Sequence, residues 1–142
     1  MDCPMSTLVR YLPAFVFLIV PAITSAGDAA SVAAALKDGA AECRYLKQLC
    51  DKARASVEDV RKRVAREAAC DAQPPIGRGA DPEALKQSPC YGIGLEPNAR
   101  ARAVVASAQI SDVKSVVEVL RAKHEKPPKC IDECNDLLRL AN

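Results

Sequence analysis

The cysteines are the residues of this sequence whose type and spacing could do chemistry. The chain of 142 residues contains seven, and six of them are Cys43, Cys50, Cys70, Cys90, Cys130 and Cys134. In a reducing compartment such residues favour metal binding or catalysis, whereas in an exported chain an even number favours disulfide bonds. The location of the protein therefore decides their chemistry.

Residues 1–26 have the pattern of a secretory signal peptide. Arg10 precedes an apolar run over residues 11–20, and a stretch of small residues that ends at Ala26 follows it. This order marks a cleaved export signal. The apolar run is about half the ~20 residues that a spanning helix needs, which argues against the alternative of an uncleaved anchor. We expect cleavage after Ala26, one domain over residues 27–142, and a periplasmic or extracellular location.

Removing the signal peptide also removes Cys3, and the other six cysteines can then form three disulfides. Cys43 and Cys50 lie about 10.5 Å apart along the axis of a predicted helix, beyond the ~7 Å limit for a bridge. Cys130 and Cys134 share a helical face, but a bridge within a regular helix there would be strained. Each of these four is therefore expected to bond to another element.

Cys70 and Cys90 bracket the flexible loop of the chain and are expected to close it. In an up-down-up arrangement the third helix is parallel to the first, and the turn at residues 127–128 lies near Cys43. The axial spacings on the two helices, ~10.5 and ~6 Å, differ, so one bridge requires the helices to cross. The resulting hypothesis is Cys43–Cys130, Cys50–Cys134 and Cys70–Cys90.

A second interpretation concerns Cys130 and Cys134 alone. Two thiolates on adjacent helical turns can hold copper(I), and His124 lies close in sequence. The alternative function is therefore a copper- or redox-handling protein. We favour the disulfides, with no metal and no cofactor, because the chain has no C-x-x-C pair of the redox, haem or zinc type. His124 is then a solvated residue at a helix end.

The other polar residues form no recognisable catalytic set. Nucleophilic catalysis would depend on the single histidine, which stands in a charged turn, although a hydrolase with an unrecognised site remains an alternative. The basic run over residues 61–66 follows Glu58 and Asp59 at the spacing of helical ion pairs and is expected to be a solvated face. The acidic residues at 132–136 are expected to form an exposed face with Lys129 and Arg139.

The composition excludes some partners. A net charge of +2 lacks the basic excess that nucleic acid or a membrane surface requires. We expect a non-catalytic binding, inhibitory or scaffold module that meets another protein, or a second copy of itself, through a helix groove or the loop at residues 91–95. After signal cleavage no membrane partner is expected.

Helices must position these residues. Residues 29–70 contain no proline and predict a helix, with a heptad face for a partner helix. That face consists of Val32, Leu36, Gly39, Cys43, Leu46, Cys50, Ala53, Val57, Val60 and Val64. Gly39 is either a point of close approach or a break between two helices.

The second half of the chain predicts a return and a third helix. A Pro/Gly-rich loop follows residue 70, with a helical turn at residues 81–86. Residues 97–125 predict a helix that Ser111 or Ser115 could cap midway, and paired valines leave a strand as the alternative. After a proline turn comes a short helix whose apolar side holds Ile131, Cys134, Leu137, Leu138 and Leu140.

The predicted fold class is all-α, a small disulfide-stapled helical hairpin or three-helix bundle with a Pro/Gly-rich loop. Tyr45 and Tyr91 are the only aromatic residues after position 26. A core of Ala, Val and Leu buries little area, so disulfides are expected to supply part of the stability.

Overall fold

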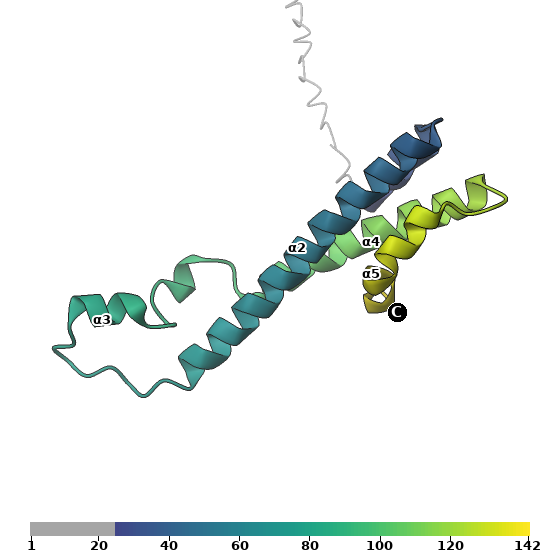
Figure 1. Cartoon of the computed structure of the whole chain (residues 1–142). Helices are drawn as coiled ribbons and strands as arrows, with labels where there is room; N and C mark the ends of the chain where they lie inside the picture. The colour runs from purple at the N-terminus through teal and green to yellow at the C-terminus, as the bar shows by residue number, and fades with distance from the viewer. Residues whose placement is uncertain (1–24) are drawn as a thin grey trace, which may run out of the picture.

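The computed structural model describes residues 25–142, and all regular structure in that part of the chain is helical (Figure 1). The predicted fold class is confirmed. The signal-peptide prediction falls almost entirely outside the described residues. The elements in order are α1 (Ser25–Ala35), α2 (Gly39–Asp71), α3 (Pro82–Gln87), the 3-10 helix η1 (Ile93–Leu95), α4 (Ala99–Lys123), the 3-10 helix η2 (Lys129–Cys134) and α5 (Asn135–Leu140).

The helices α2 and α4 form a long antiparallel hairpin (Figure 1). At 1.5 Å per residue, the 33 residues of α2 span about 50 Å and the 25 of α4 about 37 Å. Asn98 begins α4 by accepting a 2.8 Å hydrogen bond from the Ala101 amide. The strand alternative for this segment is wrong, and Ser111 and Ser115 do not cap a second half, because Val113, Val116 and Val117 are buried on one face of an uninterrupted helix.

The helix is interrupted before Gly39, so this residue marks a break between two helices rather than a point of close approach. Helix α1 ends at Ala35, and the Asp38 carboxylate begins α2 by accepting from the Ala40 amide at 3.1 Å. Helix α1 then folds back and packs along α4. Lys123 Nζ, at the end of α4, donates to the carbonyl oxygens of Ala33, at 3.2 Å, and of Leu36. A cation thus satisfies carbonyl groups that the end of α1 leaves open.

The predicted heptad face is correct only in its middle. Leu46, Cys50 and Ala53 are fully buried. Toward the start the break rotates α1, so that Ala29 and Ala33 are buried and Val32 is 44% exposed. Val64, toward the far end, is 52% exposed because no third helix reaches it.

The third layer consists of η2 and α5. Residues 129–134 form a 3-10 helix rather than the predicted α-helix. A 3-10 helix rises about 2.0 Å per residue, so Cys130 and Cys134 are separated by about 8 Å instead of about 6 Å. This stretching brings their spacing closer to the ~10.5 Å between Cys43 and Cys50. Leu140 was expected on the apolar side but is 55% exposed, because α5 ends where the core ends.

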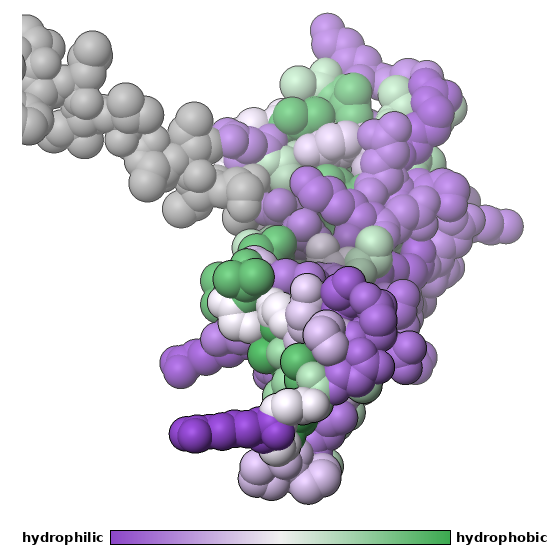
Figure 2. Space-filling view, turned by 90° about the vertical axis from the view of Figure 1, so that its left-hand side faces the viewer, coloured by the Kyte–Doolittle hydropathy of each residue, from purple (hydrophilic) through white to green (hydrophobic). Residues whose placement is uncertain are grey.

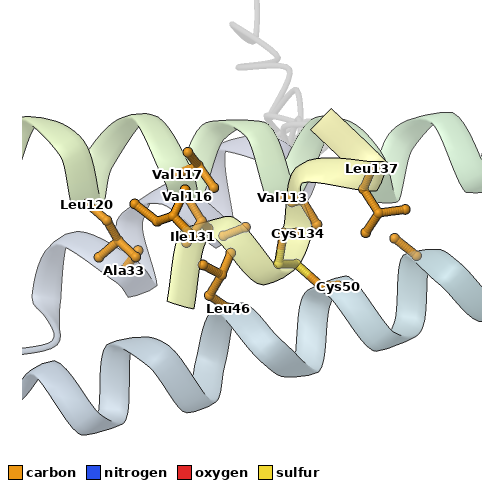
Figure 3. Packing of buried hydrophobic residues seen from close by; sticks show 12 residues of the cluster. Ala33, Leu46, Cys50, Val113, Val116, Val117, Leu120, Ile131, Cys134 and Leu137 are labelled. Atoms are coloured by element: carbon orange, nitrogen blue, oxygen red, sulfur yellow. A yellow bond between two sulfur atoms is a disulfide. The ribbon is translucent and has the colours of Figure 1, made fainter. Parts of the chain in front are cut away.

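The core lies between the first half of α2, the second half of α4, α1 and the third layer (Figure 3). Its fully buried members contain no aromatic residue: Ala29, Ala33, Leu46, Cys50, Ala53, Val113, Val116, Val117, Leu120, Ile131, Cys134 and Leu137. Figure 3 shows the Cys50–Cys134 disulfide within this cluster. The far half of the α2–α4 hairpin extends beyond it.

None of the helices in residues 25–142 combines the length and the apolar character that crossing a bilayer requires.

Candidate functional site

The six cysteines of residues 25–142 form the three predicted disulfides. Cys43–Cys130 and Cys50–Cys134 join α2 to the third layer across Cα–Cα distances of 5.8 and 6.0 Å. The Cys70–Cys90 bond, with a Cα–Cα distance of 4.8 Å, closes the loop after α2.

The proposed copper pair is therefore engaged in other bonds. The sulfur atoms of Cys130 and Cys134 are each bonded to a cysteine of α2, so neither is a free thiolate in this state. Copper(I) needs such thiolates as soft ligands. Within the described part of the chain, no three histidine, cysteine or acidic side chains are grouped as metal ligands.

His124 pairs with a buried carboxylate instead of being solvated, which corrects the expectation from the sequence. The Glu42 side chain is only 1% exposed. One of its oxygens lies 2.7 Å from Lys123 Nζ and the other 2.6 Å from His124 Nε2. The Lys123 hydrogen bond, opposed by burial and aided by His124, holds the pKa of Glu42 below its ordinary value. The carboxylate thus connects the start of α2 to the end of α4.

The basic run on α2 is a solvated face only at Arg61 and Lys62, and the prediction was wrong for Arg63 and Arg66. The Arg63 side chain is 4% exposed, and its guanidinium contacts Glu67 at 3.0 Å and Glu96 at 3.2 Å. Glu67 also accepts a 2.8 Å hydrogen bond from the Ala99 amide, which begins α4. That amide is the main cause of the lowered pKa of Glu67, and Arg63 adds to it. Arg63 therefore helps to fix α4 on α2.

The same run fixes the backbone of the loop at residues 88–95. Arg63 donates to the Ile93 carbonyl, and Arg66 donates to the carbonyls of Pro89, at 3.0 Å, and Tyr91. Two apolar side chains of this loop are exposed nevertheless, since Leu95 is 92% exposed and Tyr91 more than half exposed. Figure 2 views the molecule from the α3 end and shows apolar patches between hydrophilic residues there.

One residue of the acidic face predicted at residues 132–136, Asp136, forms an ion pair with α2. Arg54 of α2 contacts both carboxylate oxygens of Asp136 at 2.9 Å and donates to the Glu133 carbonyl. The guanidinium lowers the pKa of Asp136. Such bidentate pairing holds the start of α5 against α2.

Another carboxylate, that of Asp112, is half-buried and has no cation in hydrogen-bond contact within the described residues. Asp112 of α4 has a raised pKa because burial disfavours its charge. Within the described residues its Oδ1 atom is buried and has no hydrogen-bond partner. Burial, and then the charge of Asp112, raise the pKa of the Tyr45 phenol. No spacing or motif in the sequence indicates this pair.

The feature best suited to function is an apolar groove where the third layer ends. It lies between α2, α4 and the end of α5 and has a volume of about 420 Å³. Its apolar lining consists of Val57, Val60, Ala103, Ala106, Ile110, Leu140 and Ala141. The polar lining consists of Arg61, Ser107, Ser111 and Lys114. We call this surface the α2–α4 groove.

Sequence reasoning found only one wall of the groove. Val57 and Val60 belong to the heptad face and were expected to meet a partner helix. The α4 wall was missed, although Ala103, Ala106 and Ile110 recur at intervals of three and four. That spacing is a helical stripe, but small residues give it little contrast with the rest of an Ala-rich helix.

The comparisons with known proteins give no family or neighbour for this chain. No protein-family model matches it, and no curated protein and no solved structure is similar enough to match. The function of the chain is therefore inferred from its own geometry.

Proposed function

We propose that the protein is an exported, non-catalytic binding module that accepts an apolar segment of another protein in the α2–α4 groove. The observation that carries the proposal is an open groove beside the end of α5, with apolar side chains on both hairpin helices. Helix α5 stops at Leu140, whereas α2 continues for about 14 residues beyond Val57, at the edge of the core. The face left between the hairpin helices is apolar and open.

Export is supported by two independent features. Residues 1–26 have the pattern of a cleaved signal, and three disulfides in a small helical chain are typical of an oxidising, extracellular environment. Together they favour a periplasmic or extracellular protein that begins at Gly27.

The polar clusters support binding rather than catalysis. The two oxygens of the Glu42 carboxylate contact Lys123 and His124, and Arg63 is enclosed by two carboxylates and a carbonyl. These groups connect helix ends and hold a loop, which are structural tasks. Rigid scaffolds of this kind reduce the entropy cost of binding.

Site-specific photo-crosslinking tests the function. A benzophenone amino acid in place of Ser107 lies in the groove, and the same group in place of Ala55 lies on the exposed side of α2. In cells that export the protein, we expect a discrete adduct from position 107 and none from position 55. Equal labelling at both positions, or none at position 107 in a correctly folded variant, would contradict binding in the groove.

A further inference from the structure

The occupant of the α2–α4 groove can be identified by its chemistry, on the basis of the proposed function. We infer that it is an amphipathic α-helix of another protein, with an acidic polar face, which lies between α2 and α4 as a continuation of the third layer.

The shape of the groove fits a helix. Its walls are two antiparallel helices, and η2 and α5 already occupy the same side of this hairpin nearer the core. Ala103 and Ala106 on α4 are small, which lets a third helix approach closely, while Val57 and Val60 provide apolar contact on α2. A helix that lies in such a groove presents apolar residues at intervals of three and four.

The length of the open face sets the length of the occupant. The two-walled part of this face runs from Val57 to Glu67, beside which α4 begins at Ala99, and spans about 15 Å. The occupant is therefore a helical segment of about ten residues, or three turns. Two or three large apolar side chains on one face would fill the space above the two alanines.

The charges of the groove select an acidic partner. Its two charged lining residues are Arg61 on α2 and Lys114 on α4, both basic and on opposite walls. Arg61 has one exposed contact with Glu58 at 3.9 Å, and Lys114 makes no ion pair within the described residues. A partner with carboxylates on both edges of its apolar face would complement them.

The surface next to the groove extends this basic rim on the Lys114 side. A second hollow there shares Lys114 and adds Arg121 and Arg139, against one carboxylate, Glu118. On the Arg61 side, in contrast, an adjoining hollow holds Arg54 together with the carboxylates of Glu58 and Asp136. A second copy of this chain fits less well, because a two-fold interface across the groove would bring the basic residues of one groove close to the basic residues of the other. The occupant is therefore assigned to a different protein.

Three synthetic peptides, each long enough for three helical turns, test the inference by fluorescence anisotropy with the oxidised protein. One is an amphipathic helix with leucines on one face and glutamates on the other, the second has lysines in place of the glutamates, and the third is a scrambled form of the first. We expect the acidic helix to bind roughly tenfold more tightly than the basic one, since each exposed charge contact changes affinity a few-fold. The scrambled peptide should not bind.

Two variants place the binding in the groove. Val60→Asp should abolish binding of the acidic helix, and the double variant Arg61→Glu, Lys114→Glu should reverse the preference between acidic and basic helices. Glu125→Lys, a charge change at an exposed residue beyond the end of α4 and outside both hollows, should leave the preference unchanged. Circular dichroism confirms that each variant is folded.

Other results overturn the inference in distinguishable ways. Equal affinity for the acidic and basic helices, lost with Val60→Asp, rejects the acidic partner and leaves the groove function standing. Equal binding of the scrambled peptide, or binding of none, rejects a helical occupant, and the crosslinking at position 107 then decides the proposed function separately. A dimer in light scattering that Val60→Asp dissociates would assign the groove to a second copy.

Discussion

Replacing Glu42 with glutamine tests whether the buried carboxylate holds the helix ends together. The substitution keeps the volume of a side chain that is 1% exposed and removes its charge. A hydrogen bond to a charged group contributes about 1.5–3 kcal/mol, and two are weakened. Because Lys123 and His124 are 28% and 34% exposed and can regain water, we expect a loss of only about 2 kcal/mol in the free energy of unfolding.

This loss corresponds to a measurable change in Tm. A folded unit of the 116 residues from 27 to 142 would unfold with an entropy of about 0.24 kcal/mol/K. A loss of about 2 kcal/mol therefore lowers Tm by about 8 °C at pH 7, measured by circular dichroism without reductant. The exposed carboxylate Glu118 provides the control, and Glu118→Gln should change Tm by less than about 2 °C.

The pH dependence provides a second readout. The pKa of Glu42 is lowered in the folded protein from its ordinary value of 4.5, chiefly by the Lys123 hydrogen bond. The stability that it contributes is present above pH 4.5 and is lost as the pH falls through the folded pKa. Glutamine does not titrate, so the difference in Tm should shrink below pH 4.5. A Tm equal to that of the wild type at pH 7, or a difference that stays constant down to pH 2, would refute the role given to the carboxylate.

Three further results are expected. Arg66→Ala should speed amide hydrogen exchange in the loop around Tyr91 several-fold, because the carbonyl groups that Arg66 contacts lose a hydrogen-bond donor. Unchanged exchange would show that the loop keeps its conformation without Arg66. Replacing both Cys70 and Cys90 with serine should lower the free energy of unfolding, measured in urea, by about 3 kcal/mol, which is the chain-entropy value for a loop of 20 residues. A loss below about 1 kcal/mol would contradict this value. Asp136→Asn should lower the free energy of unfolding by about 1 kcal/mol at pH 7 and leave it unchanged at pH 2. The pKa of Asp136 is lowered in the folded protein, so its contribution to stability is present above the ordinary value of 3.8 and is lost on acidification. An equal loss at both pH values would exclude the ion pair with Arg54 as its source.

The disulfide pairing could be predicted because it depends on element order and helical rise. Cys43 and Cys50 are too far apart along one helix to pair, and an up-down-up order places the third segment beside them. The 3-10 geometry of η2 could not be predicted, because nothing local requires it. The 3-10 geometry brings the axial spacing of Cys130 and Cys134 closer to that of Cys43 and Cys50. Two regular α-helices could form both bridges only by crossing.

The polar core could not be predicted, because its partners come from distant segments. Arg63 follows Asp59 at ion-pair spacing, yet Asp59 contacts Arg102 of α4, and Arg63 is enclosed by Glu96 from a loop 33 residues away. Glu42 is equally ordinary in sequence, because its partners Lys123 and His124 are 81 and 82 residues distant. Periodicity detects apolar faces, whereas a buried ion is determined by tertiary contacts.

The break before Gly39 is a similar case. The heptad pattern continues through it, so spacing alone favours one helix as much as two. The decision depends on Lys123, which contacts carbonyl oxygens at the end of α1 only when α1 lies along α4.

The disulfides also determine how the chain behaves when its backbone is cut. Each bridge has one end on α2, and the other ends are at residue 90 and in η2, near the end of the chain. Any single cleavage between residues 44 and 129 consequently leaves both pieces covalently joined, because Cys43 and Cys130 lie on opposite sides of the cut. A protease that nicks the exposed loop after α2 would leave a molecule of nearly unchanged mass, with its groove still assembled by tethered helices. Outside the cell, this covalent topology would let the protein remain functional after damage that separates an uncrosslinked chain into fragments.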